Sequence, residues 1–130
     1  MAQLTRIKVV LVFRDMNFCS DVRGKLANMD NRYEIYESSL TGNYTSLIMN
    51  QSPDVIIMDV TKSDELSDSV IMNLSGDSDM KHIPLIFLLS SRNDEVIEGM
   101  TQMFSRDFMK KPIDYDKLDE KIKKLASENQ

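Results

Sequence analysis

Residues 52–60 read SPDVIIMDV, and within them residues 55–58 form an unbroken apolar run of Val, Ile, Ile and Met. A strand with one face in water alternates apolar and polar side chains. A continuous apolar run is instead typical of a strand buried on both faces of a parallel sheet. The run stops at Asp59. The stretch therefore predicts a central parallel strand with a carboxylate at its carboxyl end.

Comparable segments recur on both sides of this strand. Strands are predicted at residues 7–13, 33–37, 85–89 and 108–109. Between them, apolar residues spaced by three or four predict helices. Their apolar stripes are Phe18, Val22, Leu26 and Met29; Tyr44, Leu47 and Ile48; Leu66, Val70, Ile71 and Leu74; Val96, Ile97, Met100 and Met103; and Leu118, Ile122 and Leu125, the last helix running from about Asp114 to Ser127. Five βα units with right-handed crossovers predict one doubly wound α/β domain over residues 1–130, with its core at about 6–126.

Composition excludes several classes of function. A net charge of −5 and a pI near 4.8 argue against a nucleic-acid-binding surface. No apolar run is long enough to span a membrane or to form a signal peptide, and a single cysteine, Cys19, favours a reducing cytoplasm. The four glycines form no phosphate-binding loop, which argues against a nucleotide enzyme.

In a doubly wound fold the functional crevice lies beyond the carboxyl ends of the strands. Four segments are predicted to meet there: residues 13–15, 59–61, 89–91 and 110–112. A carboxylate at Asp59 is partly desolvated unless cations meet it. Lys111, held before Pro112, is predicted to reach Asp59 across the crevice.

Three pieces, SPDVIIMDV, HIPLIFLLS and RDFMKKPIDYDKL, resemble in order and spacing a bacterial response-regulator receiver domain. The resemblance covers the chain from about Arg6 to Leu125. It implies a flavodoxin-like fold, with a five-stranded parallel sheet of order 2-1-3-4-5 flanked by five helices. It also implies two-component phosphorelay signalling in the cytoplasm, with a histidine kinase or phosphotransfer protein and a downstream effector protein as partners. No nucleic-acid or membrane partner is expected.

The resemblance also assigns roles to individual residues. Asp59 takes the place of the aspartate that accepts the phosphoryl group, and Lys111 that of the lysine that pairs with the aspartate or its phosphate. Thr61 falls where a backbone carbonyl helps to hold Mg²⁺. Leu89 and Phe108 fall at the switch positions. Activity beyond self-phosphorylation and dephosphorylation of Asp59 is not expected.

The sequence departs from the receiver pattern where the metal should bind. Receivers carry two adjacent acids after the first strand, where this chain has Phe13 and Arg14, and a hydroxyl residue at the position of Leu89. Mg²⁺ requires oxygen ligands, and phosphoryl transfer depends on neutralising charge. Phosphorylation of Asp59 is therefore predicted to be weakened or lost. The hypothesis is that Arg14 replaces the ion and pairs with Asp59, whose charge it shares with Lys111.

Two alternatives stay open. In the first, a one-residue shift places Asp15 at the metal site with Asp59 and Thr61, and Ser90 replaces the lost hydroxyl, so that Mg²⁺-dependent phosphorylation persists. In the second, the chain is a flavodoxin-like binder of a small ligand. Both a monomer and a homodimer are compatible with the sequence. With no output domain in this sequence, we expect the output to be another protein or a domain that was removed from this chain.

Overall fold

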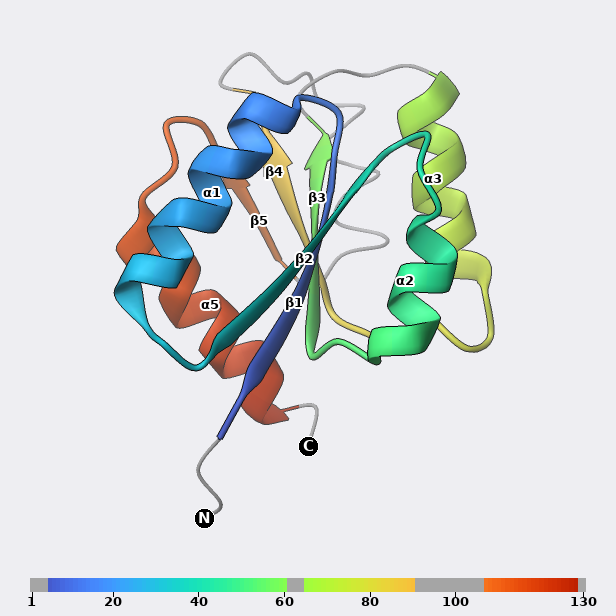
Figure 1. Ribbon diagram of the computed structural model, residues 1–130. Coiled ribbons are helices and arrows are strands. Elements are labelled where there is room, and N and C mark those ends of the chain that lie inside the picture. The colour runs from blue at the N-terminus through green and yellow to red at the C-terminus, as the bar shows by residue number, and fades with distance from the viewer. Residues whose placement is uncertain (1–4, 61–64, 91–106, 129–130) are drawn as a thin grey trace.

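A five-stranded parallel sheet forms the centre of the molecule, in a computed structural model that describes residues 5–60, 65–90 and 107–128. Its order is β2-β1-β3-β4-β5, which confirms the predicted topology (Figure 1). The strands are β1 (Ile7–Phe13), β2 (Tyr33–Ser39), β3 (Val55–Val60), β4 (Leu85–Leu89) and β5 (Asp107–Lys110).

Three strands run further than the apolar pattern indicates. β5 is predicted at residues 108–109 and spans Asp107–Lys110. β2 was predicted to stop at Glu37, but Ser38 and Ser39 pair with the last two residues of β1. β3 is predicted to end at Asp59, and it continues one residue further to Val60, with Asp59 paired to Leu88. Polar side chains extend a strand here because backbone hydrogen bonds to the neighbouring strand continue past the apolar residues.

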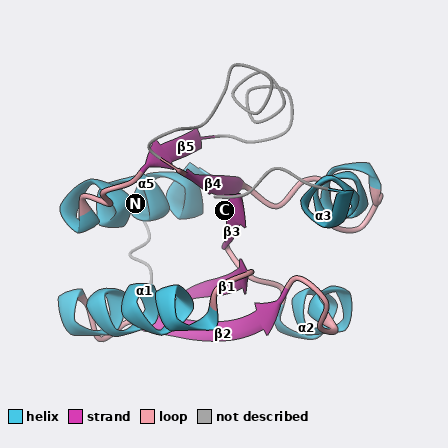
Figure 2. Cartoon of the chain, turned by 90° about the horizontal axis from the view of Figure 1, so that it is seen from above, coloured by secondary structure: helices cyan, strands magenta, loops and turns pink. Residues whose placement is uncertain are grey.

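Helices cover both faces of the sheet. Seen from above, α1 (Met16–Met29) and α5 (Tyr115–Glu128) lie on one side, and α2 (Tyr44–Gln51) and α3 (Glu65–Gly76) lie on the other (Figure 2). The remaining predicted helix, with its stripe from Val96 to Met103, lies outside the described residues, as does Thr61. None of the helices within the described ranges is long and apolar enough to cross a lipid bilayer.

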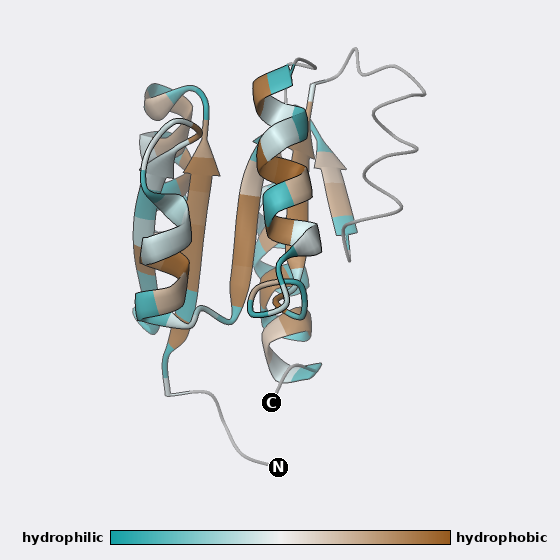
Figure 3. Ribbon diagram, turned by 90° about the vertical axis from the view of Figure 1, so that its right-hand side faces the viewer, coloured by the Kyte–Doolittle hydropathy of each residue, from teal (hydrophilic) through white to brown (hydrophobic). Residues whose placement is uncertain are grey.

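The core consists of two apolar clusters, one on each face of the sheet, because successive strand residues point to opposite faces. Figure 3 shows the hydrophobic colouring of the strands between the helices. Val10, Val12, Ile56 and Met58 belong to the cluster under α2 and α3. Their neighbours in the strands belong to the cluster under α1 and α5: Ile7, Val9, Leu11, Phe13, Val55 and Ile57. Two buried faces explain why the strands carry continuous apolar runs.

The buried side of α1 differs from the predicted stripe at both ends: Met29 is 37% exposed, and Cys19 takes the place of Phe18. Cys19, Val22 and Leu26 are buried, whereas Phe18 is half-buried and packs at the margin of the core. The spacings 18–22–26 and 19–22–26 both suit a helix, and the small thiol lies against the sheet. The aromatic ring is thereby left at the carboxyl edge of the sheet.

A polar cluster joins α1, β2 and α5. The Tyr33 hydroxyl donates to Asp119 Oδ1 at 2.6 Å. Lys123 Nζ lies 3.0 Å from Asp30 Oδ2 and 3.1 Å from Asp119 Oδ2, and Arg32 also pairs with Asp30. These contacts, made by residues far apart in the chain, fix α5 to the α1–β2 corner.

Candidate functional site

The carboxyl ends of β1, β3 and β4 meet at one edge of the sheet, and Asp59 is the buried acid there. Its side chain is 1% exposed. Asp59 Oδ2 accepts the backbone N–H groups of Arg14 at 3.3 Å and of Asp15 at 3.4 Å. Consecutive N–H groups at the start of a helix make a small concavity suited to an anion. The carboxylate of Asp59 therefore occupies the anion-binding position formed by the backbone N–H groups of Arg14 and Asp15.

Arg14 contacts two other elements. While its backbone N–H faces Asp59, its guanidinium Nη2 donates to Ser67 Oγ at 3.1 Å. Ser67 lies in the first turns of α3 and is 1% exposed. One residue thus bridges the end of β1, the end of β3 and the start of α3, and it brings a permanent positive charge into the crevice.

Asp15 is the N-cap of α1. Its Oδ1 accepts the backbone N–H groups of Asn17 at 2.9 Å and of Phe18 at 3.3 Å. Such a cap satisfies donors that have no partner within the helix. The hydrogen bonds of the Asp15 side chain are those of a helix cap. Its role as a metal ligand stays a prediction.

Lys111 reaches this edge but meets an aromatic ring. Its Nζ lies 3.8 Å from the centre of the Phe18 ring, and that ring is 5.2 Å from the ring of Phe13, tilted by 51°. The Lys111 backbone N–H donates to the carbonyl of Leu89 at 2.9 Å, and the Lys111–Pro112 peptide bond is cis. Among the described residues, the recorded partner of the ammonium group is Phe18, not Asp59.

The two predicted switch positions lie on neighbouring strands, where Leu89 pairs with Lys110 and Phe108 pairs with Phe87. Leu89 is fully buried and presents hydrocarbon where receivers carry a hydroxyl. Phe108 is half-buried and packs against the cluster under α2 and α3. Ser90, the candidate replacement hydroxyl, follows β4 and is half-buried.

The side chains described at this corner do not fit Mg²⁺. Phe13 is a buried ring, Arg14 carries positive charge, and Asp15 caps a helix. Within the described ranges, no three His, Cys, Asp or Glu side chains come together to hold an ion. Mg²⁺ is normally held by one or two carboxylates with waters and phosphate oxygens. Among the described side chains at this corner, Asp59 is the one that offers a buried carboxylate to a metal ion.

Two contacts of this site were missed in the sequence. Ser67 lies on no apolar stripe, and nothing in the sequence marks it as a partner of Arg14. Phe18 was assigned to the core from its spacing, although an aromatic residue three positions after an N-cap acid also suits the mouth of a crevice. The contact between the tilted rings of Phe13 and Phe18 could have been suspected from the aromatic residue at the lost acid position.

A buried thiol lies on the other side of α1. Cys19 Sγ donates to Glu37 Oε2 at 3.1 Å, and Arg23 pairs with the same carboxylate. Burial, and then the hydrogen bond to Glu37, raise the pKa of Cys19 to about 12. The bond from Cys19, with the Arg23 charge, lowers the pKa of Glu37. A thiol that stays protonated is a poor nucleophile, so this contact is structural.

Comparison with known proteins identifies the fold. No family model and no curated protein matches the sequence. Among solved structures, the chain is similar to the signal receiver domain of a DNA-binding response regulator from Colwellia psychrerythraea, with 16% identity, a TM-score of 0.78 and coverage of 93% of this chain and 98% of that one. It is also similar to the signal receiver domain of a signal transduction histidine kinase from Syntrophus aciditrophicus, with 20% identity, a TM-score of 0.76 and coverage of 93% and 90%. A response regulator from Desulfuromonas acetoxidans gives 18% identity, a TM-score of 0.73 and coverage of 93% and 97%.

The chain therefore has the fold of response-regulator receiver domains, over nearly its whole length. At identities of 16% to 20%, what the comparisons establish is the architecture.

Proposed function

We propose that this chain is a receiver-type signalling domain that acts through contacts with other proteins. Asp59 is its phosphoacceptor position, and its partners are a histidine kinase or phosphotransfer protein and a downstream effector protein. The fold supports the proposal, as does a buried Asp59 at the carboxyl end of β3, at the same edge of the sheet as Lys111, which directly follows β5.

Phosphorylation of Asp59 is weak or absent in this proposal. The observation that carries this point is the pair of N–H bonds from Arg14 and Asp15 to Asp59 Oδ2, together with the bond from the Arg14 guanidinium to Ser67. Phosphoryl transfer is mainly positioning and charge neutralisation. Arg14 supplies a fixed positive charge beside Asp59, which balances one carboxylate but repels a divalent cation.

The position of Lys111 adds a second barrier. For Asp59 to accept a phosphoryl group, a carboxylate oxygen bonds to phosphorus as the bond from phosphorus to the donor breaks. Lys111 would need to neutralise the charge that the phosphoryl oxygens bring. In this structure its ammonium group lies over Phe18 and would first have to leave the ring.

The test is an incubation with Mg²⁺ and acetyl phosphate, followed by intact mass. We expect little or no phosphoryl adduct on the wild-type chain. Arg14→Asp restores one of the lost acids and should increase the adduct, whereas Arg14→Asn removes the cation without adding a carboxylate and is the matched control. Asp59→Asn should abolish any adduct.

A second candidate is an atypical receiver that is still phosphorylated on Asp59. One observation favours it: both capping bonds go to Asp15 Oδ1, and Oδ2 accepts no hydrogen bond from the described residues. A strong wild-type adduct that is lost in both Asp59→Asn and Asp15→Asn would establish this candidate instead. A preparation that carries a bound small ligand would favour the flavodoxin-like binder.

A further inference from the structure

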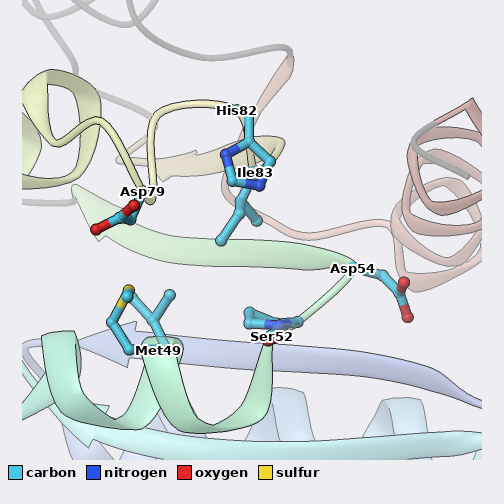
Figure 4. Close-up of a pocket in the computed structure, with 8 residues that line it drawn as sticks. Met49, Ser52, Asp54, Asp79, His82 and Ile83 are labelled. Atoms are coloured by element: carbon cyan, nitrogen blue, oxygen red, sulfur yellow. The ribbon is translucent and has the colours of Figure 1, made fainter.

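A pocket lies at the opposite edge of the sheet from Asp59, at the amino ends of β3 and β4 (Figure 4). Its volume is about 250 Å³. The residues around it come from the end of α2, the loop between α2 and β3, and the loop between α3 and β4: Ile48, Met49, Ser52, Pro53, Asp54, Asp79, His82 and Ile83. Nothing in the proposed phosphorylation chemistry uses this pocket.

Backbone hydrogen bonds fix both walls. On one side, Ser52 adopts a left-handed conformation with φ 48°, and its N–H donates to the carbonyl of Ile48 at 2.9 Å. On the other side, Asp77 Oδ1 accepts the N–H groups of Asp79 at 2.7 Å and of Met80 at 3.2 Å, and Met80 is 3% exposed. A pocket with such walls is formed before a ligand arrives, which lowers the entropy cost of binding.

The floor is apolar and the rim is polar. Ile48, Pro53 and Ile83 are buried, whereas Met49, at 49% exposed, and the side chains of Asp79 and His82 reach solvent. Unbranched Met adapts its shape to different partners. The rim can therefore close around a group that has an apolar stem and a polar end.

Of the two carboxylates that line the pocket, Asp79 is the one available to a ligand. Asp54 Oδ2 accepts the backbone N–H of Lys8 at 2.9 Å, and its side chain points away from the pocket (Figure 4). Within the described residues, the Asp79 carboxylate makes no hydrogen bond or ion pair, and it lies across the pocket from Met49, at the same end of it (Figure 4). A cation in the pocket would thus meet an unpaired acid.

We propose that this pocket binds an arginine side chain presented by a partner protein. At about 250 Å³ it is smaller than the pockets that hold drug-sized ligands, but it suits one long side chain. The arginine stem would lie on the apolar floor and Met49, and its planar guanidinium would form two parallel hydrogen bonds to Asp79. The net charge of −5 favours a basic partner segment.

The proposal is tested by a ¹⁵N NMR titration of the full chain with the blocked tripeptide acetyl-Leu-Arg-Leu-amide. We expect saturable shifts of the amides of Met49, Ser52, Asp79 and His82. The same peptide with citrulline, which keeps the shape but not the charge, should bind at least about tenfold more weakly. Asp79→Asn should weaken the arginine peptide similarly, with the rest of the spectrum unchanged because Asp79 is exposed.

The matched control is Asp116→Asn, which makes the same change at an exposed carboxylate on α5. It should leave the affinity of the peptide unchanged. The proposal would be overturned by shifts that spread over the surface, or by equal binding of the citrulline peptide. Equal binding of the arginine peptide by Asp79→Asn would also overturn it. Because Asp59 is not involved, the titration succeeds or fails independently of phosphorylation.

Discussion

The ammonium group of Lys111 lies 3.8 Å from the centre of the Phe18 ring, and that ring packs against Phe13, the residue at the position of a lost acid. The loss of the acid and the position of the lysine are therefore connected through one aromatic pair. A cation held by a ring is attracted by the ring's quadrupole and needs no counter-ion. In this chain, the crevice lysine has a resting partner other than Asp59.

This contact should be measurable as a coupling free energy. In a double-mutant cycle of Phe18→Leu and Lys111→Met, we expect a coupling of about 0.5 to 1 kcal/mol in the free energy of unfolding. Urea denaturation of the four proteins measures it. Because the cycle cancels the loss of the Phe13–Phe18 contact, a coupling near zero would show that the lysine is not held by the ring in solution.

The bond between Arg14 and Ser67 should stabilise the junction of β1 and α3. We expect Arg14→Met to lower the free energy of unfolding by about 1 to 2 kcal/mol, since it removes a hydrogen bond from a charged donor to a buried hydroxyl. A cycle with Ser67→Ala isolates the contribution of this pair.

Lys25→Ala, an exposed position on α1, is the comparison for loss of a surface cation. It should change stability by less than about 0.5 kcal/mol. If Arg14→Met were equally harmless, the bridge to Ser67 would be absent in solution.

Two substitutions of Asp15 distinguish its role as a helix cap from a role of its negative charge, such as metal binding. Asp15→Ala should cost about 1 kcal/mol of stability, because two backbone donors of α1 lose their acceptor. Asp15→Asn keeps a capping oxygen and should be nearly as stable as the wild type. Chemical denaturation measures both variants, and a large loss in Asp15→Asn would mean that the charge, rather than the cap, is what α1 needs.

Acid should weaken the polar cluster of α1, β2 and α5 through Asp30. Hydrogen bonds from Arg32, and then from Lys123, hold the pKa of Asp30 well below its usual value of 3.8. A group with a lowered pKa in the folded state stabilises the fold above its unfolded pKa, and this contribution fades as the pH falls below about 4. The urea midpoint of the wild type should therefore drop more steeply below pH 4 than that of Asp30→Asn.

The control for this pH series is Asp116→Asn, whose carboxylate is exposed and has no hydrogen bond or ion pair within the described ranges. Its acid profile should run parallel to that of the wild type. An Asp30→Asn profile that is also parallel would contradict the assignment.

The sheet was predictable because its three central strands, β1, β3 and β4, are buried on both faces. β1 and β4 have the predicted bounds, since each apolar run is followed at once by a polar residue, Arg14 or Ser90. The end of β2 was missed, because Ser38 and Ser39 are typical turn residues and only their pairing with β1 keeps them in the strand. Sequence patterns report side-chain burial, whereas hydrogen bonds between strands decide where a strand ends.

The site was predictable in its location but not in its contacts. Parallel topology brings Asp59, Arg14 and Lys111 to one edge, whatever their side-chain conformations. Which partner each side chain selects depends on rotamers and on residues of neighbouring elements, such as Ser67 and Phe18. No sequence motif or characteristic spacing marks these residues as partners in the site. Their roles are therefore visible only in the three-dimensional structure.

The two core clusters have a consequence for how the chain folds during its synthesis. The buried members of the cluster under α2 and α3 lie between Val10 and Leu89, whereas the opposite cluster needs Leu118, Ile122, Leu125 and Ala126 from α5. On a ribosome, the first face can close while the second is still open, since the residues that cover it have not yet been made. The bond between Tyr33 and Asp119, which joins positions 86 residues apart, can form only after that delay. Until then, the sheet exposes an apolar face to the cell, and this is the interval in which a chaperone would have most to bind.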